Sequence, residues 1–321
     1  MKAIVQDRYG SPDVLELRDI DKPVVRDDDV LVRVHAAGVN IGDWHVLRGM
    51  PYPIRIAGYG LRKPKNAVRG INVAGTVEAV GTNVTAHQPG DEVFGWCEGA
   101  FAEYARAGEG NFLAKPAGLP FEQAAVVGDS ALTALQAVRD KGEVQPGQKV
   151  LINGASGGVG TFAVQIAKAL GAEVTGVCSA RNVDLVRSIG AEQVIDYTRE
   201  DFTASGRRYE VVIDLVGSRS LSDCRRALSP KGTYVLVGVS DPGRWGLGRT
   251  LGVLLLSPFV GQKMRAFIMT ANRVDLIALR ELVEAGKLTP VIDRTYKLSD
   301  VPEALRYQGE GHSQGKIVIT L

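Results

Sequence analysis

The residues with the clearest chemical potential are the glycines of the segment Ala155-Ser156-Gly157-Gly158-Val159-Gly160. An apolar run, Val150–Ile152, precedes them and residues at helical spacing follow, so we expect a turn between a buried strand and a helix. Glycines in such a turn let the backbone approach a pyrophosphate, and the N–H groups of the helix N-terminus face the phosphates. A tight turn that binds no ligand remains the alternative for this motif alone.

The next predicted strand, Val174–Cys178, ends at Ser179, Arg181 and Asn182. NAD sites usually carry Asp or Glu here, about 20 residues past the glycines, to bind the ribose 2′-hydroxyl. The sequence offers no carboxylate at this strand end, and its hydroxyl, guanidinium and amide suit a 2′-phosphate. This favours NADPH as the cofactor, although Arg181 alone is equally compatible with a solvated loop cation.

Composition limits the classes of protein that the chain can represent. Its 321 residues favour two domains, and 38 basic against 36 acidic residues provide no field that would attract nucleic acid or a membrane. The three cysteines are far apart, which argues against a disulfide framework and favours a reducing, cytoplasmic setting. The first eight residues carry charges too early for the apolar region of a secretion signal, so no such signal is expected. The apolar run Leu251–Leu256 is too short to span a bilayer and is expected in a core or an interface.

The first third of the chain is rich in predicted strands, and the middle alternates strand and helix. Expected strands at 30–34, 74–80, 92–95 and 99–105, divided by glycine turns, indicate a partly closed β-barrel. From about Phe121 helical patterns appear, with helices expected at 122–127 and 131–138. The alternation that follows the glycine turn predicts a doubly wound parallel sheet of six strands. The last strands and helix are expected to return to the first domain.

These motifs together resemble the medium-chain dehydrogenase/reductase family, in its zinc-free quinone oxidoreductase branch, which includes zeta-crystallin. The segments that carry the resemblance are Gly38–Asp43, Val73–Gly81, Pro89–Gly95, Gly99–Tyr104, Leu132–Leu135, residues 154–160 and Gly190–Tyr197. The resemblance implies a Rossmann nucleotide-binding domain at 123–265 and a GroES-like barrel domain formed by 1–122 and 266–321. It further implies a cofactor and substrate cleft where they meet, and a homodimer.

The resemblance also implies which residues bind the cofactor. Thr133 and the backbone near Val216 and Gly238 would hold nicotinamide and ribose, and Gly315 with Lys316 would close the other side. The full expected set is Thr133, Ser156, Gly157, Gly158, Val159, Ser179, Arg181, Asn182, Tyr197, Val216, Gly238, Gly315 and Lys316.

Four residues are candidates for the chemistry itself. By resemblance, Asn40 and Asp43 would lie near the nicotinamide ring. The alternative is a structural role, in which Asn40 ties a turn and Asp43 caps a helix over Trp44–Leu47. Tyr52 and Tyr59 could donate a proton to a developing enolate, and otherwise would line a pocket.

Two departures from the family pattern bear on the site. Asn72 replaces the usual Asp of its motif, which is expected to loosen a local hydrogen bond, and the segment 56–69 is longer than in zeta-crystallin and is expected near the substrate mouth. Asn40, Asp43 and Asn72 also stand where the zinc-dependent relatives carry ligands. The nitrogen and sulfur ligands that zinc prefers are missing, so no metal is expected.

Hydride transfer from NADPH to a quinone or an α,β-unsaturated carbonyl is therefore the expected reaction, because no Lewis acid is available to activate a simple carbonyl. A reductase or dehydrogenase of simple carbonyls or alcohols, and an NADPH-binding protein without activity, remain alternatives. The apolar segment Thr233–Leu256 is the expected sheet edge at which two copies would pair.

Overall fold

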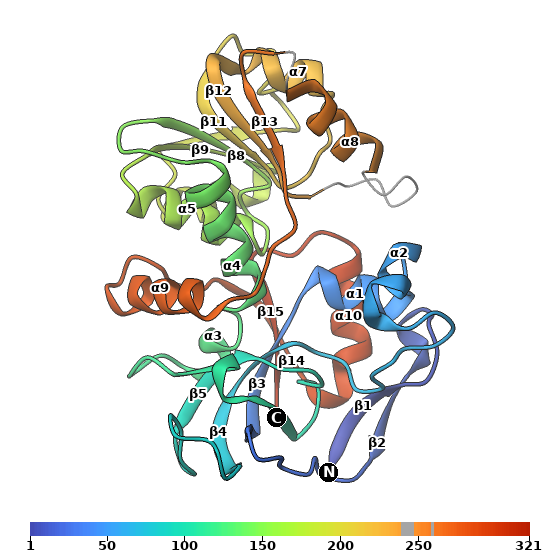
Figure 1. Ribbon diagram of the computed structural model, residues 1–321. Helices are drawn as coiled ribbons and strands as arrows, with labels where there is room; N and C mark the ends of the chain where they lie inside the picture. The colour runs from blue at the N-terminus through green and yellow to red at the C-terminus, as the bar shows by residue number, and fades with distance from the viewer. Residues whose placement is uncertain (239–246, 258–259) are drawn as a thin grey trace. The chain divides into compact units, whose positions relative to one another are not determined.

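The computed structural model describes residues 1–238, 247–257 and 260–321. The chain forms two compact units (Figure 1). The first unit comprises Met1–Asp129, Asn272–Glu284 and Pro290–Leu321, and the second comprises Ser130–Ala271 and Ala285–Thr289. None of the helices in these ranges combines the length and apolarity that crossing a bilayer requires.

The second unit is built on a six-stranded parallel sheet in the order β10-β9-β8-β11-β12-β13. Its strands are β8 (Lys149–Asn153), β9 (Glu173–Cys178), β10 (Gln193–Asp196), β11 (Tyr209–Asp214), β12 (Leu228–Leu236) and β13 (Lys263–Ala266). Its helices are α4 (Asp129–Leu135), the π-helix η4 (Gln136–Lys141), α5 (Gly160–Ala169), the 3-10 turn η5 (Ala180–Asn182), α6 (Val183–Ser188), α7 (Leu221–Arg226) and α8 (Leu247–Leu256). The expected doubly wound sheet is confirmed.

Strand order reverses between β8 and β11, since the chain runs outward from β8 through β9 and β10 and then returns to β11. In doubly wound folds, ligands bind at the carboxyl ends of the strands at such a switch point. The glycine turn follows β8 directly, so the topology places the predicted phosphate-binding segment at this point.

The first unit contains a seven-stranded sheet in the order β14-β15-β3-β4-β5-β7, with β6 paired to β3, and a separate hairpin of β1 and β2. Its strands are β1 (Lys2–Gln6), β2 (Leu15–Asp19), β3 (Asp29–Val39), β4 (Asn72–Val80), β5 (Glu92–Trp96), β6 (Tyr104–Gly108), β7 (Phe112–Ala114), β14 (Ile292–Lys297) and β15 (Lys316–Thr320). The α-helices are α1 (Ile41–Arg48), α2 (Tyr52–Ile54), α3 (Phe121–Ala124), α9 (Arg273–Glu284) and α10 (Val301–Gly309). Single turns complete it: η1 (Pro12–Val14), η2 (Arg55–Tyr59), η3 (Glu109–Asn111) and η7 (Leu298–Asp300).

Packing explains why the two ends of the chain join one unit. Val32 and Ile317 are fully buried in the same apolar cluster as Phe101. β15 also pairs antiparallel with β3, so the last strand completes the sheet that the first third begins. The return of the C-terminal part to this unit agrees with the sequence-based expectation.

Three predicted elements differ from the structure. The strand expected at 99–105 begins only at Tyr104: Gly99 has φ +86°, and Ala102 forms an isolated bridge with Ala3. The helix expected at 131–138 becomes α4 followed by η4. The proposed sheet edge Thr233–Leu256 is wrong: β12 lies between β11 and β13, and Leu251–Leu256 belongs to helix α8. Residues 239–246 of that segment lie outside the described residues.

Candidate functional site

The glycine turn after β8 has the geometry that a pyrophosphate site needs. Gly154 has φ +90°, so it makes the sharp turn one residue before Ala155, which explains why alanine is tolerated at the first position of the motif. A Cβ on Gly160 would lie 2.0 Å from the Gly154 carbonyl oxygen, so only glycine allows the helix to start so close to the strand. A Cβ on Gly157 would meet only that oxygen, at 3.5 Å, so the chain leaves the space beside Gly157 open.

Donor and acceptor groups at this turn fit a nucleotide. Within the described part of the chain, the N–H groups of Gly158 and Val159 have no acceptor at the N-terminus of α5. The Asn182 amide donates to Ser156 Oγ at 2.9 Å and to Ser179 Oγ at 3.3 Å, and its buried Oδ1 meets no donor among the described residues. Buried polar atoms are usually hydrogen-bonded, so an unpaired acceptor here is consistent with a site for a ligand hydroxyl.

The carboxyl ends of β9 and β10 carry the residues expected to recognise the 2′-phosphate. Tyr197 N–H donates to the Cys178 carbonyl, which places Tyr197 beside Ser179, and the Tyr197 and Arg181 side chains are exposed. The end of β9 itself carries no carboxylate, but the end of the neighbouring strand β10 does. Asp196, the last residue of β10, pairs in register with Cys178, and its carboxylate accepts from Thr198 N–H and Oγ1. These bonds lower its pKa, so it is ionised.

Asp214 organises the loop at the end of β11. Its buried Oδ1 accepts from Asn153 Nδ2 at 2.8 Å and from the backbone N–H groups of Val216 and Gly217 at 3.2 and 2.8 Å. Val216 lies against the glycine turn, since a Cβ on Gly154 would come within 2.8 Å of its Cγ2. The structure thus joins the predicted nicotinamide residue Val216 to the phosphate turn.

The second oxygen of Asp214 binds two residues that sequence reasoning missed. Oδ2 accepts from Tyr234 Oη at 2.6 Å and from Arg249 Nη2 at 3.1 Å, and Arg249 also donates to Tyr234 Oη at 2.7 Å. Burial first, and the Asp214 charge second, raise the pKa of Tyr234, so the hydroxyl stays protonated and donates. Asp214 could have been found from the sequence, because it is a charged residue at the end of the otherwise apolar strand β11. No feature of the sequence points to Arg249.

Gly238 lies at the same edge, because a Cβ on it would come within 2.3 Å of the Leu215 carbonyl oxygen. Thr133 lies half-buried on α4. The second unit therefore brings together the turn, Val216 and Gly238 at one place and Ser179, Arg181, Asn182 and Tyr197 at the neighbouring strand ends.

The first unit contains a buried polar cluster, defined by Asn40, Asp43, Asn72, Asp129 and Lys316. Lys316 Nζ donates to the Val39 carbonyl at 3.0 Å and to Asn40 Oδ1 at 2.5 Å. Asn40 Nδ2 in turn donates to Asn72 Oδ1 at 2.6 Å. The sheet brings these residues together, since Ile317 pairs with Val39 and Asn72 pairs with Gly38.

Asn72 links this cluster to Asp129 through two long hydrogen bonds, so the expected loosening at this position stays a prediction. Its Nδ2 donates to Asp129 Oδ1 at 3.5 Å, and the Asp129 N–H contacts its Oδ1 at 3.4 Å. An aspartate at position 72 would face the Asp129 carboxylate and repel it, whereas the amide offers a donor. A Cβ on Gly128 would lie 1.8 Å from Asn72 Nδ2, so glycine at 128 makes room for the amide. Sequence reasoning missed Asp129.

Asp43 accepts a hydrogen bond at the start of a helix and has a raised pKa. Its Oδ2 accepts from the Asn40 N–H at 2.8 Å at the start of α1, which begins at Ile41 and not at Trp44. Burial raises the pKa of Asp43 to about 7, against the opposing effect of this hydrogen bond. Burial likewise lowers the pKa of Lys316 to about 8 and raises that of Asp129. Lys316 and Asp43 therefore change charge closer to neutral pH than exposed groups of their kind would.

Both candidate tyrosines are exposed, Tyr59 at 40% and Tyr52 at 62%. Tyr59 ends η2, and partial burial first, then the charges of Asp129 and Asp43, raise the pKa of its phenol. Tyr52 is exposed, with the Arg55 guanidinium 5.0 Å from its ring. Gly315, at φ +93°, precedes Lys316 and leads the chain into β15.

Comparison with known proteins identifies the family. The family described as "Alcohol dehydrogenase GroES-like domain" matches residues 26–119, and the one described as "Zinc-binding dehydrogenase" matches residues 189–319. The "NAD(P)H oxidoreductase RTN4IP1, mitochondrial" of Mus musculus is 35% identical, over 100% of this chain and 89% of that protein. The chain belongs to the medium-chain dehydrogenase/reductase family.

Solved structures of family members agree with this assignment. The quinone oxidoreductase from Coxiella burnetii has a TM-score of 0.88 at 33% identity and covers 100% of this chain and 99% of its own. The CurK enoyl reductase has a TM-score of 0.86 at 25% identity and covers 99% and 98%. This medium-chain dehydrogenase/reductase is thus an NAD(P)H oxidoreductase that uses a nicotinamide cofactor, with a Rossmann unit and a GroES-like unit.

The raised pKa of Asp43 predicts how the stability of this family member changes with pH. The folded protein keeps a proton that the unfolded chain releases near pH 4, so Asp43 contributes most stability below that pH and its contribution is lost as pH rises toward 7. Asp43→Asn keeps an acceptor for the Asn40 N–H and removes the titration. We expect the variant to gain stability relative to wild type between pH 4 and 7, by about 1.4 kcal/mol per pKa unit of the shift.

Urea unfolding at several pH values measures this difference. Asp21→Asn, an exposed aspartate in the same unit, is the control and should follow wild type. Parallel curves for Asp43→Asn and wild type would show that Asp43 titrates normally.

Proposed function

We propose that this enzyme transfers hydride from NADPH to a quinone or an α,β-unsaturated carbonyl compound without the help of zinc. The hydrogen-bonded chain from Lys316 through Asn40 to Asn72 carries the proposal. Its asparagines stand at the positions where zinc-dependent relatives bind their metal, and they offer amides in place of thiolate and imidazole. The ammonium group of Lys316 in the same chain would repel a metal cation. Without a Lewis acid, an acceptor already activated by conjugation is the suitable substrate.

NADPH is favoured over NADH by the edge formed by β9 and β10. Arg181 can form a forked, charge-assisted pair with the 2′-phosphate, and Ser179 and Tyr197 can add neutral hydrogen bonds. The ionised Asp196 carboxylate at the neighbouring strand end opposes this preference, but its hydrogen bonds to Thr198 already occupy Oδ1.

When bound, the cofactor supplies the hydride, and the protein must position it and protonate the product. Asp214 fixes the Val216–Gly217 backbone, and Gly158 and Val159 offer N–H donors to the phosphates. Reduction of an enone leaves an enolate that takes one proton. We assign that role to Tyr59, whose phenol is protonated at neutral pH and whose pKa is influenced by the charges of Asp129 and Asp43 in the buried cluster.

A panel of acceptors tests the reaction. NADPH oxidation should be measured with 1,4-benzoquinone, with a 2-alkenal and with a saturated aldehyde of equal length. NADP⁺ reduction should be measured with the corresponding alcohol. We expect turnover of the quinone or the alkenal, and little with the saturated pair. Turnover confined to the saturated aldehyde or the alcohol would overturn the proposal and favour the carbonyl reductase alternative.

The metal prediction follows from the same residues. The purified enzyme is expected to contain no stoichiometric zinc and to keep its activity after dialysis against EDTA, because the buried cluster offers no suitable ligand set. Elemental analysis together with activity assays measures both. One tightly bound zinc per chain, or activity lost in EDTA and restored by zinc, would contradict it.

A homodimer is expected to form through the second unit. β13 is the outer strand of its sheet in the described residues, and Leu251, Leu254 and Leu255 expose one apolar face of α8. An exposed edge next to apolar side chains favours pairing with a second copy. Light scattering at micromolar concentration should give the dimer mass, and Leu254→Lys with Leu255→Lys should shift it toward monomer. Ile56→Lys, at an exposed apolar site in the first unit, is the control.

A further inference from the structure

The second unit carries a basic hollow at the end of the sheet opposite to the glycine turn. A pocket of about 380 Å³ is lined by Arg208, Ser222, Arg225, Arg226, Pro230, Gly261 and Gln262. Arg208 directly precedes β11, Pro230 lies near the amino end of β12, and Gln262 directly precedes β13. In a parallel sheet these amino ends lie together, whereas Asp214 and the glycine turn mark the carboxyl ends.

Two of the three arginines in this pocket lack an acidic partner. Arg226 pairs with Asp223 at 2.6 Å. Arg208 and Arg225 form no ion pair with any described residue: Arg208 donates to the Leu228 carbonyl at 2.9 Å, and Arg225 Nε donates to Gln262 Oε1 at 2.9 Å. Each of these bonds uses one of five N–H donors of its guanidinium, so most of the donors remain available.

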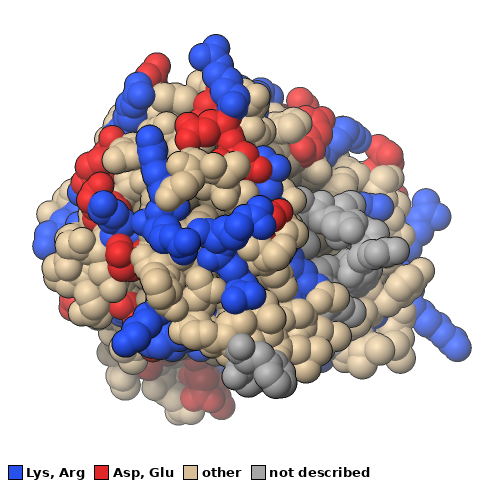
Figure 2. Space-filling view, turned by 90° about the horizontal axis from the view of Figure 1, so that it is seen from above, with Lys and Arg blue, Asp and Glu red and all other residues tan. Residues whose placement is uncertain are grey.

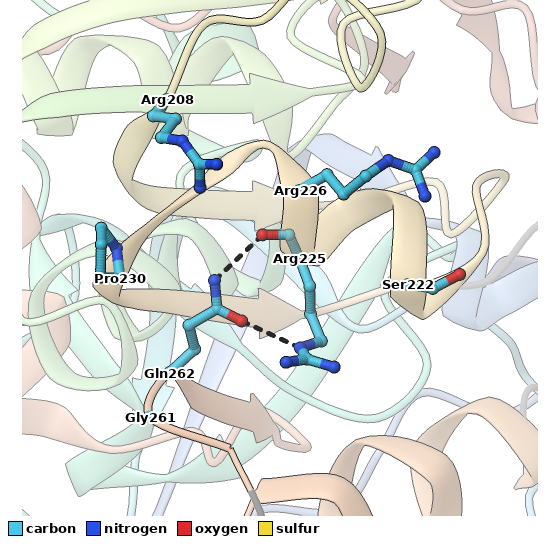
Figure 3. A pocket seen from close by; sticks show the side chains of 7 residues that line it. All are labelled: Arg208, Ser222, Arg225, Arg226, Pro230, Gly261 and Gln262. Carbon is cyan, nitrogen blue, oxygen red and sulfur yellow. Dashed lines mark hydrogen bonds between the residues drawn. The ribbon is translucent and has the colours of Figure 1, made fainter.

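Gln262 holds one of these guanidinium groups in a fixed place. It accepts from Arg225 Nε and returns a hydrogen bond from its own Nε2 to the Arg225 carbonyl at 3.0 Å. Figure 3 shows this reciprocal pair, with Arg208 and Arg226 on either side of it. A guanidinium that is oriented before binding loses less conformational freedom when it binds an anion.

The surroundings also favour an anion. The face of the molecule that carries α7, seen in Figure 2, presents a concentration of Lys and Arg side chains with fewer acidic ones among them. The chain as a whole has a formal net charge of only +2, so a general excess of basic residues does not explain the concentration of positive charge on this face. Clustered positive charge next to a concave surface raises the local concentration of anions.

We propose that this pocket binds a small phosphate-bearing anion, at a site separate from the cofactor site. A phosphate monoester carries nearly two negative charges at neutral pH, which matches the two guanidinium groups without acidic partners. Planar guanidinium groups bind phosphate oxygens in pairs, and the Ser222 hydroxyl can add a neutral hydrogen bond. The volume is at the lower end of the range for ligand pockets and accommodates a pyrophosphate or the phosphate end of a nucleotide.

Calorimetric titration of the whole protein with sodium pyrophosphate, and separately with ADP, tests the proposal when saturating NADPH is present to occupy the glycine turn. We expect saturable binding of pyrophosphate that Arg208→Gln or Arg225→Gln weakens roughly 10-fold or more, the factor that corresponds to one charge-assisted hydrogen bond. Arg208→Gln removes only one bond to a carbonyl, so it remains informative if Arg225→Gln disturbs the fold. Tighter binding of ADP than of pyrophosphate, lost in the same variants, would identify a nucleotide as the source of the phosphate.

Two control variants test whether pyrophosphate binding depends on the arginines that line this pocket. Arg207→Gln removes the same charge one residue away, outside the pocket lining, and should leave binding unchanged. Arg181→Gln alters the cofactor edge and should also leave it unchanged, so the outcome does not depend on the proposed reaction. No binding at millimolar pyrophosphate, equal weakening in Arg207→Gln, or loss only in Arg181→Gln would each overturn the proposal.

Discussion

Replacing Arg181 by alanine is expected to weaken NADPH binding by roughly 10- to 100-fold and to leave NADH binding nearly unchanged. A charge-assisted hydrogen bond contributes roughly 1.5–3 kcal/mol, and about 1.4 kcal/mol corresponds to a tenfold change in affinity. NADH lacks the 2′-phosphate that Arg181 would bind. The dissociation constants of both cofactors, measured by fluorescence titration for wild type and variant, give the answer.

Arg187→Ala is the matched control, because Arg187 is an exposed arginine on α6 that is not among the expected cofactor residues. It should bind both cofactors as wild type does. If the Asp196 carboxylate dominated this edge, wild type would prefer NADH. That result, or equal weakening of both cofactors in Arg181→Ala, would contradict the assignment of this loop.

Replacing Arg249 by methionine is expected to lower the free energy of unfolding by about 3–5 kcal/mol, the usual cost of breaking a buried ion pair. The Asp214 carboxylate is fully buried, and Arg249 is its cationic partner at 3.1 Å. Methionine fills much of the same volume, so the loss would reflect the uncompensated charge. Urea unfolding measures it, and cofactor affinity should fall as well, because Asp214 also anchors the Val216–Gly217 backbone.

Tyr234→Phe provides the comparison for this prediction. It removes one hydrogen bond to Asp214 but keeps the ion pair, so we expect a smaller loss of about 1–3 kcal/mol. A stability for Arg249→Met equal to that of wild type would show that the carboxylate is satisfied without the guanidinium.

The sequence predicted those parts of the molecule that depend on local patterns. The glycine turn, the alternation that builds the sheet, and the residues at the ends of β9 were all readable because each involves neighbours in the chain. The strand expected at 99–105 is shorter than predicted: Gly99 adopts a positive φ, and Ala102 pairs with Ala3 of β1, a partner that lies far away in the chain.

Side chains that meet across long stretches of chain could not be predicted in this way. Asn72 contacts Asp129 over 57 residues, and Arg249 contacts Asp214 over 35. Asp196 was overlooked because it ends a neighbouring strand rather than the strand that follows the glycine turn. In each case the partner is fixed by sheet order and register, which the pattern of a single segment does not specify.

The position of β15 has a consequence for how the chain is synthesised and folds. β15 lies between β14 and β3, yet it follows every other strand of that sheet in the chain. On the ribosome, β3 and β4 can pair early, and the second unit can fold as its strands emerge. The place beside β3 stays open until β15 arrives with Lys316 at its start. The buried cluster is therefore complete only after β15 has been made, so shorter nascent chains would expose the apolar edge of β3.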